Sequence, residues 1–319
     1  MNKSTSNLKL LSISKKIFIK NKRKINFLFT IFIILYFYLN VDFEFFFSQL
    51  KKIPVVSFAL IILVLLPSPC LLILKWYLIV KSNIKKKFFY LYEKISTGIV
   101  VSELTQNNLV LDIYKFIYLN NLEVKKKIYY ILLEKFLTLS VRLVYILILL
   151  NIFEFFDLLN IKKDLLLLAN ISVILISALF FLLILIKFFP SKKSLVSIFL
   201  SNIAFSLKKN KFSIFILFLL ETIKNVILSL AYYISFSIFF DNSTSLTFVL
   251  MGLIIEILLR IQFFSATGFR EYFIYLFGSS IIDQKDTVLV ATIFVTFSML
   301  ISNLTNYFFL RLFKNFKKL

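Results

Sequence analysis

A glycine, an arginine and a glutamate stand close together inside an apolar stretch of the chain. The stretch is FSATGFREYFIYLFGSS, residues 264–280, and the three residues are Gly268, Arg270 and Glu271. Gly268 allows a turn, and a helix that begins near Phe269 would direct its free N–H groups and positive dipole end toward that turn. Arg270 adds a full positive charge, which Glu271 can orient or offset. The pattern predicts an anion site, and the anion abundant at membrane depth is a lipid phosphate.

Other apolar segments also contain ionisable side chains, although a charge at the bilayer centre costs about 2.5–3.5 kcal/mol. Glu221, Lys224 and Asn225 have the spacing of one helix face. Glu256 and Arg260 form an i, i+4 pair with the acid first, which is the favourable order. We interpret these residues as the polar lining of a cavity. Buried ion pairs that lock helices together are the alternative, and the sequence leaves both open.

A second interrupted apolar region, residues 88–124, contains Asp112 and Lys115. We predict that these two residues bind the same headgroup as the 264–280 stretch. Lys115 and Lys135 lie close to a predicted membrane edge, and for them the simpler interpretation is a long side chain that reaches the surface.

The composition is typical of an all-α polytopic membrane protein. Hydrophobic residues make up 60% of the chain, with only 4 Gly and 4 Pro, and the mean hydropathy is +0.91. The apolar blocks are continuous rather than alternating, and several reach the roughly 20 residues of a membrane-spanning helix, so a β-barrel is not expected. The absence of His and the single cysteine, Cys70, argue against a metal site, and we expect no metal and no cofactor.

Hydrophobic blocks predict six full spans, which are residues 25–40, 53–80, 135–153, 164–187, 212–240 and 287–310. Two further regions, 88–124 and 246–280, are apolar but broken. Pro67 and Pro69 are predicted to kink the second span, and Trp76 near its end is predicted to anchor it at the interface.

Charge distribution fixes the predicted orientation. The net charge is +22, but the lysines cluster between apolar blocks, so the positive-inside rule explains them better than nucleic-acid binding does. Both termini are then cytoplasmic, and each broken region begins and ends on one side, as a re-entrant hairpin or a pair of short spans. The two halves, 25–153 and 164–310, form an inverted-topology repeat. The chain is predicted to comprise a basic tail (1–24), one transmembrane domain (25–310) and a second basic tail (311–319).

Two segments resemble the membrane region of bacterial lysylphosphatidylglycerol synthases and of the stand-alone flippase-like proteins that share it. ATGFREYFIYLFGSSIIDQKDTVLVATIF is similar to the family's Gly-Gly-x-Gly-x-Arg-Glu segment, which Gly268, Arg270 and Glu271 match. SELTQNNLVLDIYKF is similar to a Pro-Gly-x-x-Gly-Gly-Asp-x-x-Arg segment, with Asp112 at the acid and Lys115 at the Arg. The proline and glycines of the second motif are absent.

Two shorter matches extend this resemblance over nearly the whole chain. Lys75–Trp76 matches a family Arg-Trp pair, and Glu134–Lys135 matches a Glu-Arg pair. The resemblance implies a multi-pass protein of the bacterial cytoplasmic (inner) membrane that moves an anionic phospholipid or a polyprenyl-phosphate-linked glycolipid between leaflets. The chain ends at Leu319 after a basic tail, so we expect neither the soluble synthetase domain nor enzymatic activity.

Two other functions stay open at this point. One is an integral membrane glycosyltransferase, or its accessory subunit, that works with cell-envelope biosynthesis enzymes; the chain has no Asp-x-Asp or Asp-Asp to support it. The other is a structural subunit of an envelope-assembly complex. No Gly-x-x-x-x-Gly-Lys-Ser/Thr loop occurs, so any transport is expected to be downhill, ion-coupled or driven by a partner.

Overall fold

The computed structural model describes residues 42–81, 88–104, 108–119, 122–155, 211–260, 269–278 and 284–316, with the single residues 31, 35 and 39. Every regular element in these residues is an α-helix. The helices are α2 (Phe43–Lys51), α3 (Val55–Leu65), α4 (Pro67–Val80), α5 (Phe88–Leu104), α6 (Asn108–Tyr118), α7 (Val124–Phe155), α10 (Lys211–Phe236), α11 (Asn242–Arg260), α12 (Phe269–Gly278) and α13 (Lys285–Phe316). The predicted tail 1–24, most of the span 25–40, the span 164–187, Gly268 and the end of the second tail (317–319) lie outside the described residues.

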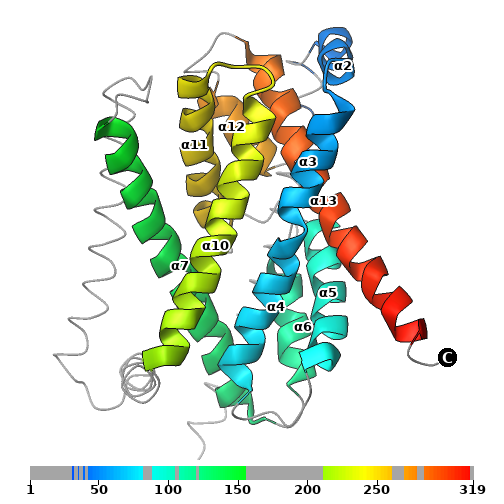
Figure 1. The fold of residues 1–319 in the computed structure, drawn as a ribbon, viewed down its shortest axis with the longest axis vertical. Coiled ribbons are helices and arrows are strands. Elements are labelled where there is room, and N and C mark those ends of the chain that lie inside the picture. The colour runs from blue at the N-terminus through cyan, green and yellow to red at the C-terminus, as the bar shows by residue number, and fades with distance from the viewer. Residues whose placement is uncertain are drawn as a thin grey trace, which may run out of the picture.

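Three of the predicted spans correspond to helices long and apolar enough to cross a membrane. These are Val55–Val80, Phe215–Phe236 and Asp286–Phe309, with 26, 22 and 24 residues. At 1.5 Å per residue, each exceeds the hydrocarbon thickness of about 30 Å. Figure 1 shows α3 and α4 running end to end along the long axis, with α10 and α13 on either side of them. The prediction of an all-helical fold is confirmed for the described residues, and these three segments have the length and apolarity of membrane-spanning helices.

The prolines of the second span interrupt it as predicted. α3 ends at Leu65 and α4 begins at Pro67, while Leu66 between them keeps helical angles (φ −49°, ψ −42°). Proline has no N–H to donate, so carbonyls near the break lose their helical partners. Asn306 of α13 donates from Nδ2 to the Leu66 carbonyl over 2.8 Å. This bond ties the weak point of the span to a neighbouring helix.

Two helices are longer than the sequence predicted. The predicted span 135–153 is the second part of the 32-residue helix α7, and Lys125–Lys127, predicted as a connecting segment, lie in its first turn. Lysine favours helix, and Lys127 Nζ lies 4.8 Å from the centroid of the Phe116 ring, which gives its charge a partner. α13 likewise continues through Phe316, so most of the predicted C-terminal tail is helical.

Both broken apolar regions form two short helices each. Region 88–124 contains α5 and α6, which lie in the lower half of Figure 1, and region 246–280 contains most of α11 and all of α12, in the upper half. α5 and α6 pack closely, since a Cβ on Gly98 would lie 2.8 Å from Tyr114 Cβ. Residues 105–107 and 261–268, where the predicted interruptions fall between these helices, lie outside the described residues.

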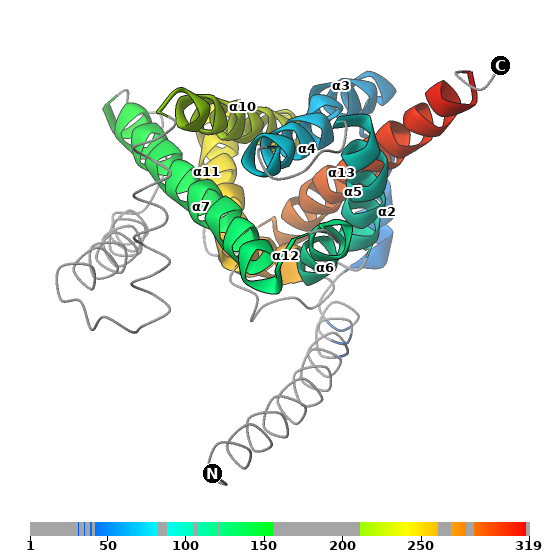
Figure 2. The same cartoon turned by 90° about the horizontal axis from the view of Figure 1, so that it is seen from below.

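α7 and α10 connect the parts of the bundle. Seen from below, α4 and α10 lie side by side, as do α5 and α6, and α7 extends from beside α10 to beside α6 (Figure 2). α11 packs on both α7 and α10. Its first turn follows Asp241, whose carboxylate accepts a hydrogen bond from the Ser243 hydroxyl. This bond lowers the pKa of Asp241 below its ordinary value. α7 therefore touches helices from both broken regions, α6 and α11, while α10 packs on α4, α7 and α11.

Candidate functional site

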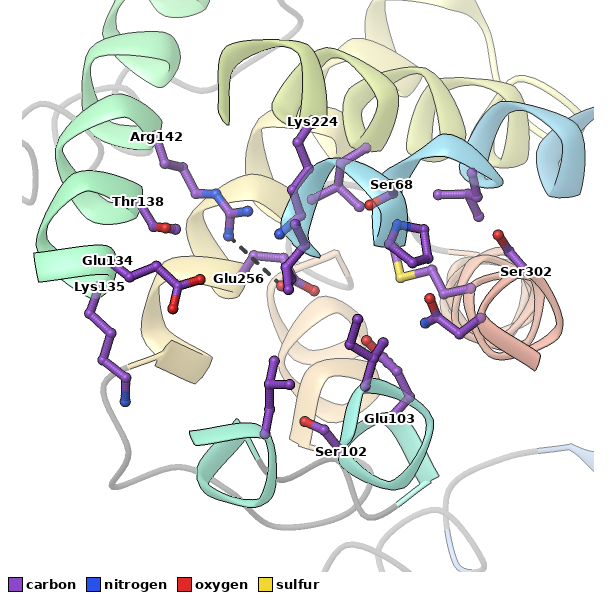
Figure 3. Close-up of a pocket in the computed structure, with 18 of the residues that line it drawn as sticks. Ser68, Ser102, Glu103, Glu134, Lys135, Thr138, Arg142, Lys224, Glu256 and Ser302 are labelled. Atoms are coloured by element: carbon purple, nitrogen blue, oxygen red, sulfur yellow. Dashed lines mark ion pairs between the residues drawn. The ribbon is translucent and has the colours of Figure 1, made fainter. Parts of the chain in front are cut away.

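A cavity of about 140 Å³ lies where the two broken regions meet. Side chains of α3 to α7 and of α10 to α13 line it. Asp112, Lys115, Lys224, Glu256 and Arg270 line it, all of which the sequence assigned to the site. Figure 3 shows that Arg142, Lys224 and Glu256 point toward its middle. Gly268 and the side chain of Arg260 lie outside the described residues.

Two lysines and two glutamates on four helices form a buried group that we call the lysine network. Lys75 Nζ on α4 lies 2.5 Å from Glu221 Oε2 on α10 and 3.6 Å from Glu134 Oε1 on α7. Lys115 Nζ on α6 lies 2.5 Å from Glu134 Oε2. All four side chains are at most 5% exposed. Such burial is tolerable only because each charge has an opposite charge in contact.

The lysine network continues toward solvent on one side and toward an aromatic ring on the other. Lys135 Nζ lies 2.5 Å from Asp112 Oδ2, and these side chains are 25% and 14% exposed. Lys115 Nζ lies 5.2 Å from the centroid of the Trp76 ring. Trp76 is fully buried, so the predicted interface anchor is wrong. The indole packs under the ion pairs, where its ring face favours a cation.

A second buried group, the arginine network, consists of Arg142, Arg270, Glu256 and Asn225. Arg270 Nη2 lies 2.8 Å from Glu256 Oε1, and Arg142 Nη1 lies 3.8 Å from Glu256 Oε2. Arg142 also donates from Nε to Asn225 Oδ1 over 3.0 Å. The network links α7, α10, α11 and α12, so the second broken region is fixed to α7, which also holds Lys115 of the first.

Glu271 also lies next to this network. Its Oε1 accepts a hydrogen bond of 2.7 Å from the Thr296 hydroxyl on α13. The sequence predicted that Glu271 would orient or offset Arg270. Glu271 lies beside Arg270 in the first turn of α12, where its charge acts on the guanidinium, and its hydrogen bond to Thr296 fixes it to α13.

Helical spacing explains why α7 and α10 can serve both networks. Along α10, Glu221 and Asn225 are four residues apart, as predicted for one helix face. Along α7, Glu134 and Arg142 are eight residues apart, which is about 12 Å of helix rise. Thr138 lies midway, and its hydroxyl oxygen accepts a hydrogen bond of 2.6 Å from Lys75 Nζ. The two networks are therefore one above the other on a shared wall.

Arg270 lacks strong acceptors for part of its guanidinium group. Nη2 is bound to Glu256, but Nη1 donates to Met299 Sδ over 3.5 Å, and sulfur is a weak acceptor. Among the described residues, none offers an acceptor to Arg270 Nε. Ser302 Oγ, on the cavity wall and 1% exposed, likewise has no hydrogen-bond partner in the described part of the chain. A buried donor left in this state costs about 1–3 kcal/mol, so an anionic oxygen in the cavity would be stabilised here.

Charges around the cavity balance. The basic side chains that line it or lie behind its wall, counted over the described residues, are equal in number to the acidic ones. They are Lys75, Lys115, Lys135, Arg142, Lys224 and Arg270 against Glu103, Asp112, Glu134, Glu221, Glu256 and Glu271. An ionic but neutral interior avoids the cost of a net charge at membrane depth.

Sequence reasoning did not assign Lys75, Glu134, Arg142 or Ser302 to the site. The signal for the first three was present, because each is a charged residue within or beside an apolar helix. Ser302 gave no such signal, since a serine in a membrane helix commonly bonds to its own backbone. No group of three or more potential metal ligands occurs in the segments that the structure describes. Comparisons with protein-family models, curated proteins and solved structures found no match to this chain.

Proposed function

We propose that the protein binds the phosphate headgroup of a membrane lipid in this cavity and carries it between leaflets, as a flippase does. The substrate would be an anionic phospholipid or a polyprenyl-phosphate-linked glycolipid. The single observation behind the proposal is the state of Arg270, which lines the cavity in the first turn of α12 with one nitrogen on Met299 sulfur and another lacking a described acceptor. A phosphate oxygen would supply the acceptor that Nε lacks, or replace the weak sulfur acceptor of Nη1, and would be favoured by the positive end of the α12 dipole.

The membrane arrangement under this proposal has six full spans and two re-entrant hairpins, α5–α6 and α11–α12. Both termini are cytoplasmic, the two halves form an inverted repeat, and the membrane is the bacterial cytoplasmic membrane. The proposal draws support from the position of the two helix pairs at opposite ends of the bundle (Figure 1). Rocking of one half against the other would open the cavity to each side in turn.

Thiol labelling tests this orientation. Lys81, at the end of α4, and Asn242, at the start of α11, are both exposed and lie at opposite ends of the bundle. In a Cys70→Ala background, Asn242→Cys should react with an impermeant maleimide added to intact cells, and Lys81→Cys should react only after the membrane is opened. The reverse pattern would show that the protein is inserted the other way up.

Lipid movement is tested with the purified full-length chain in liposomes. Fluorescent phosphatidylglycerol or fluorescent polyprenyl phosphate is placed in both leaflets, and a membrane-impermeant reductant bleaches the outer leaflet. We expect the bleached fraction to exceed that of protein-free vesicles for the phosphate lipids but not for fluorescent glucosylceramide, which has no phosphate. Bleaching equal to that of protein-free vesicles for both phosphate lipids would contradict the proposal.

A small substitution tests whether the cavity is the place of binding. Ser302→Ala should weaken binding of phosphatidylglycerol about tenfold, because one hydrogen bond to a charged group is worth about 1.5 kcal/mol or more. Ser298→Ala is the matched control on the same helix: Ser298 is also buried, but its hydroxyl donates to the Phe294 carbonyl over 2.8 Å. Equal affinities of the two variants, measured by titration in detergent, would place the phosphate elsewhere.

A further inference from the structure

We infer that the lysine network is a proton-binding site, and that one proton enters it whenever the lipid phosphate binds at Arg270. The inference rests on the proposed function and names what would drive it. Its starting point is the charge balance of the cavity: the described basic and acidic groups cancel. A phosphodiester brings one negative charge, and an uncompensated charge in a site of low dielectric is costly. Uptake of one proton keeps the loaded site neutral.

The lysine network is the part of the site where a proton can be added with the smallest loss of contacts. Lys75 lies between two carboxylates, 2.5 Å from Glu221 and 3.6 Å from Glu134. When Glu221 takes a proton, Glu134 still holds Lys75, whereas Glu134 also contacts Lys115 and stays ionised. The proton becomes the O–H of a carboxylic acid, and no other bond is made or broken.

The arginine network is less suited to this role. Glu256 lies within 4 Å of two guanidinium groups, those of Arg142 and Arg270. Arginine keeps its charge in proteins, so both cations favour an ionised Glu256. In this division the arginines, whose charge is fixed, bind the phosphate, and the lysine–glutamate pairs bind the proton.

Charged groups on every helix around the network belong to the same balance. Facing it are Glu103 on α5, Asp112 on α6, Lys135 and Arg142 on α7, Lys224 on α10, Glu256 on α11, and Arg270 and Glu271 on α12; from α13 the cavity wall has Ser302 and Asn303. Asp112 and Lys135 are the partly exposed pair. They line the same cavity as Glu134, so water that reaches this pair would give the proton a route of entry.

Linkage makes the inference measurable. If binding of one lipid takes up one proton, the binding constant rises by up to tenfold for each unit that the pH falls, over the range in which the carboxylate titrates. The purified full-length chain is titrated with short-chain phosphatidylglycerol in weak buffer, with a pH-sensitive dye in solution. We expect about one proton taken up per lipid bound.

A variant separates the proton from the phosphate. Glu221→Gln imitates the protonated acid, so its lipid affinity should be tight and independent of pH, with no proton uptake. Glu123→Gln is the control, because Glu123 is an exposed acid outside the cavity. Lipid binding by the wild type with no proton uptake and no pH dependence would overturn the inference and leave the proposed function intact. Absence of lipid binding at every pH would overturn both.

Trp76 gives a second readout that needs no substitution. It is the chain's single tryptophan, fully buried, with Lys115 Nζ over its ring at 5.2 Å. A change in charge within the network alters the field at the indole, so its emission should change with pH and shift again when phosphatidylglycerol binds. Emission unchanged by pH and by lipid, while the dye records proton uptake, would move the proton site away from these residues.

Discussion

Lys75→Met should lower the free energy of unfolding by about 3–5 kcal/mol, the largest stability effect expected from a single substitution in this chain. Lys75 is 2% exposed and holds Glu221 and Glu134 at 2.5 and 3.6 Å. Methionine fills similar space but leaves Glu221, 1% exposed, without the cation that now lies against it. Removal of one partner from a buried ion pair has a cost of this size.

The double variant Lys75→Met/Glu221→Leu distinguishes charge from packing. Because it removes a buried pair rather than one partner, it should recover most of the lost stability. Lys81→Met, at the exposed end of α4, is the control and should be close to neutral. Denaturant unfolding of the full-length protein in detergent gives the three values. A Lys75→Met protein as stable as the wild type would mean that the pair is hydrated, contrary to its burial.

The length of the apolar blocks made the membrane helices predictable from the sequence. The ion pairs could not be predicted in this way. The spans 53–80, 212–240 and 287–310 could be located because an apolar block of sufficient length is a local property. Lys75 and Glu221 are 146 residues apart in the chain, and no local pattern connects them. The sequence shows that each charged side chain in an apolar helix has a high cost of burial, but it does not show which charged side chains form ion pairs.

Glu256 illustrates the same limit. Its helical spacing predicted Arg260 as a partner, four residues away. The side chain of Arg260 lies outside the described residues, and the structure gives Glu256 two further cations, Arg142 from α7 and Arg270 from α12. Spacing along one helix identifies possible partners on that helix alone, while a buried carboxylate is satisfied by whichever cations the packing brings near. Arg270 was predictable as a site residue because Gly268 and the new helix start stand beside it in the sequence.

Arg270→Gln should reduce the movement of fluorescent phosphatidylglycerol at least about 30-fold, the largest functional effect expected. Loss of one partner of a buried, hydrogen-bonded charge pair costs about 2–5 kcal/mol, and the phosphate would lose its main cation. Arg270→Lys should be intermediate, because lysine keeps the charge but not the planar fork that two phosphate oxygens accept. Initial rates of bleaching in liposomes, at equal protein content, measure the three proteins.

A misfolded variant would also move lipid slowly, so a second substitution in the same network is needed to separate loss of stability from loss of lipid binding. Arg270→Gln also deprives Glu256 of its partner at 2.8 Å, which destabilises the protein for reasons unrelated to lipid. In Arg270→Gln/Glu256→Gln both charges of this pair are gone, but Arg142 also loses its contact with Glu256 at 3.8 Å, so stability should return in part while lipid movement stays low. Recovery of movement together with stability would show that Arg270 only supports the fold. The phosphate would then have to bind elsewhere, and Lys115 and Lys135 would be the next cavity cations to substitute.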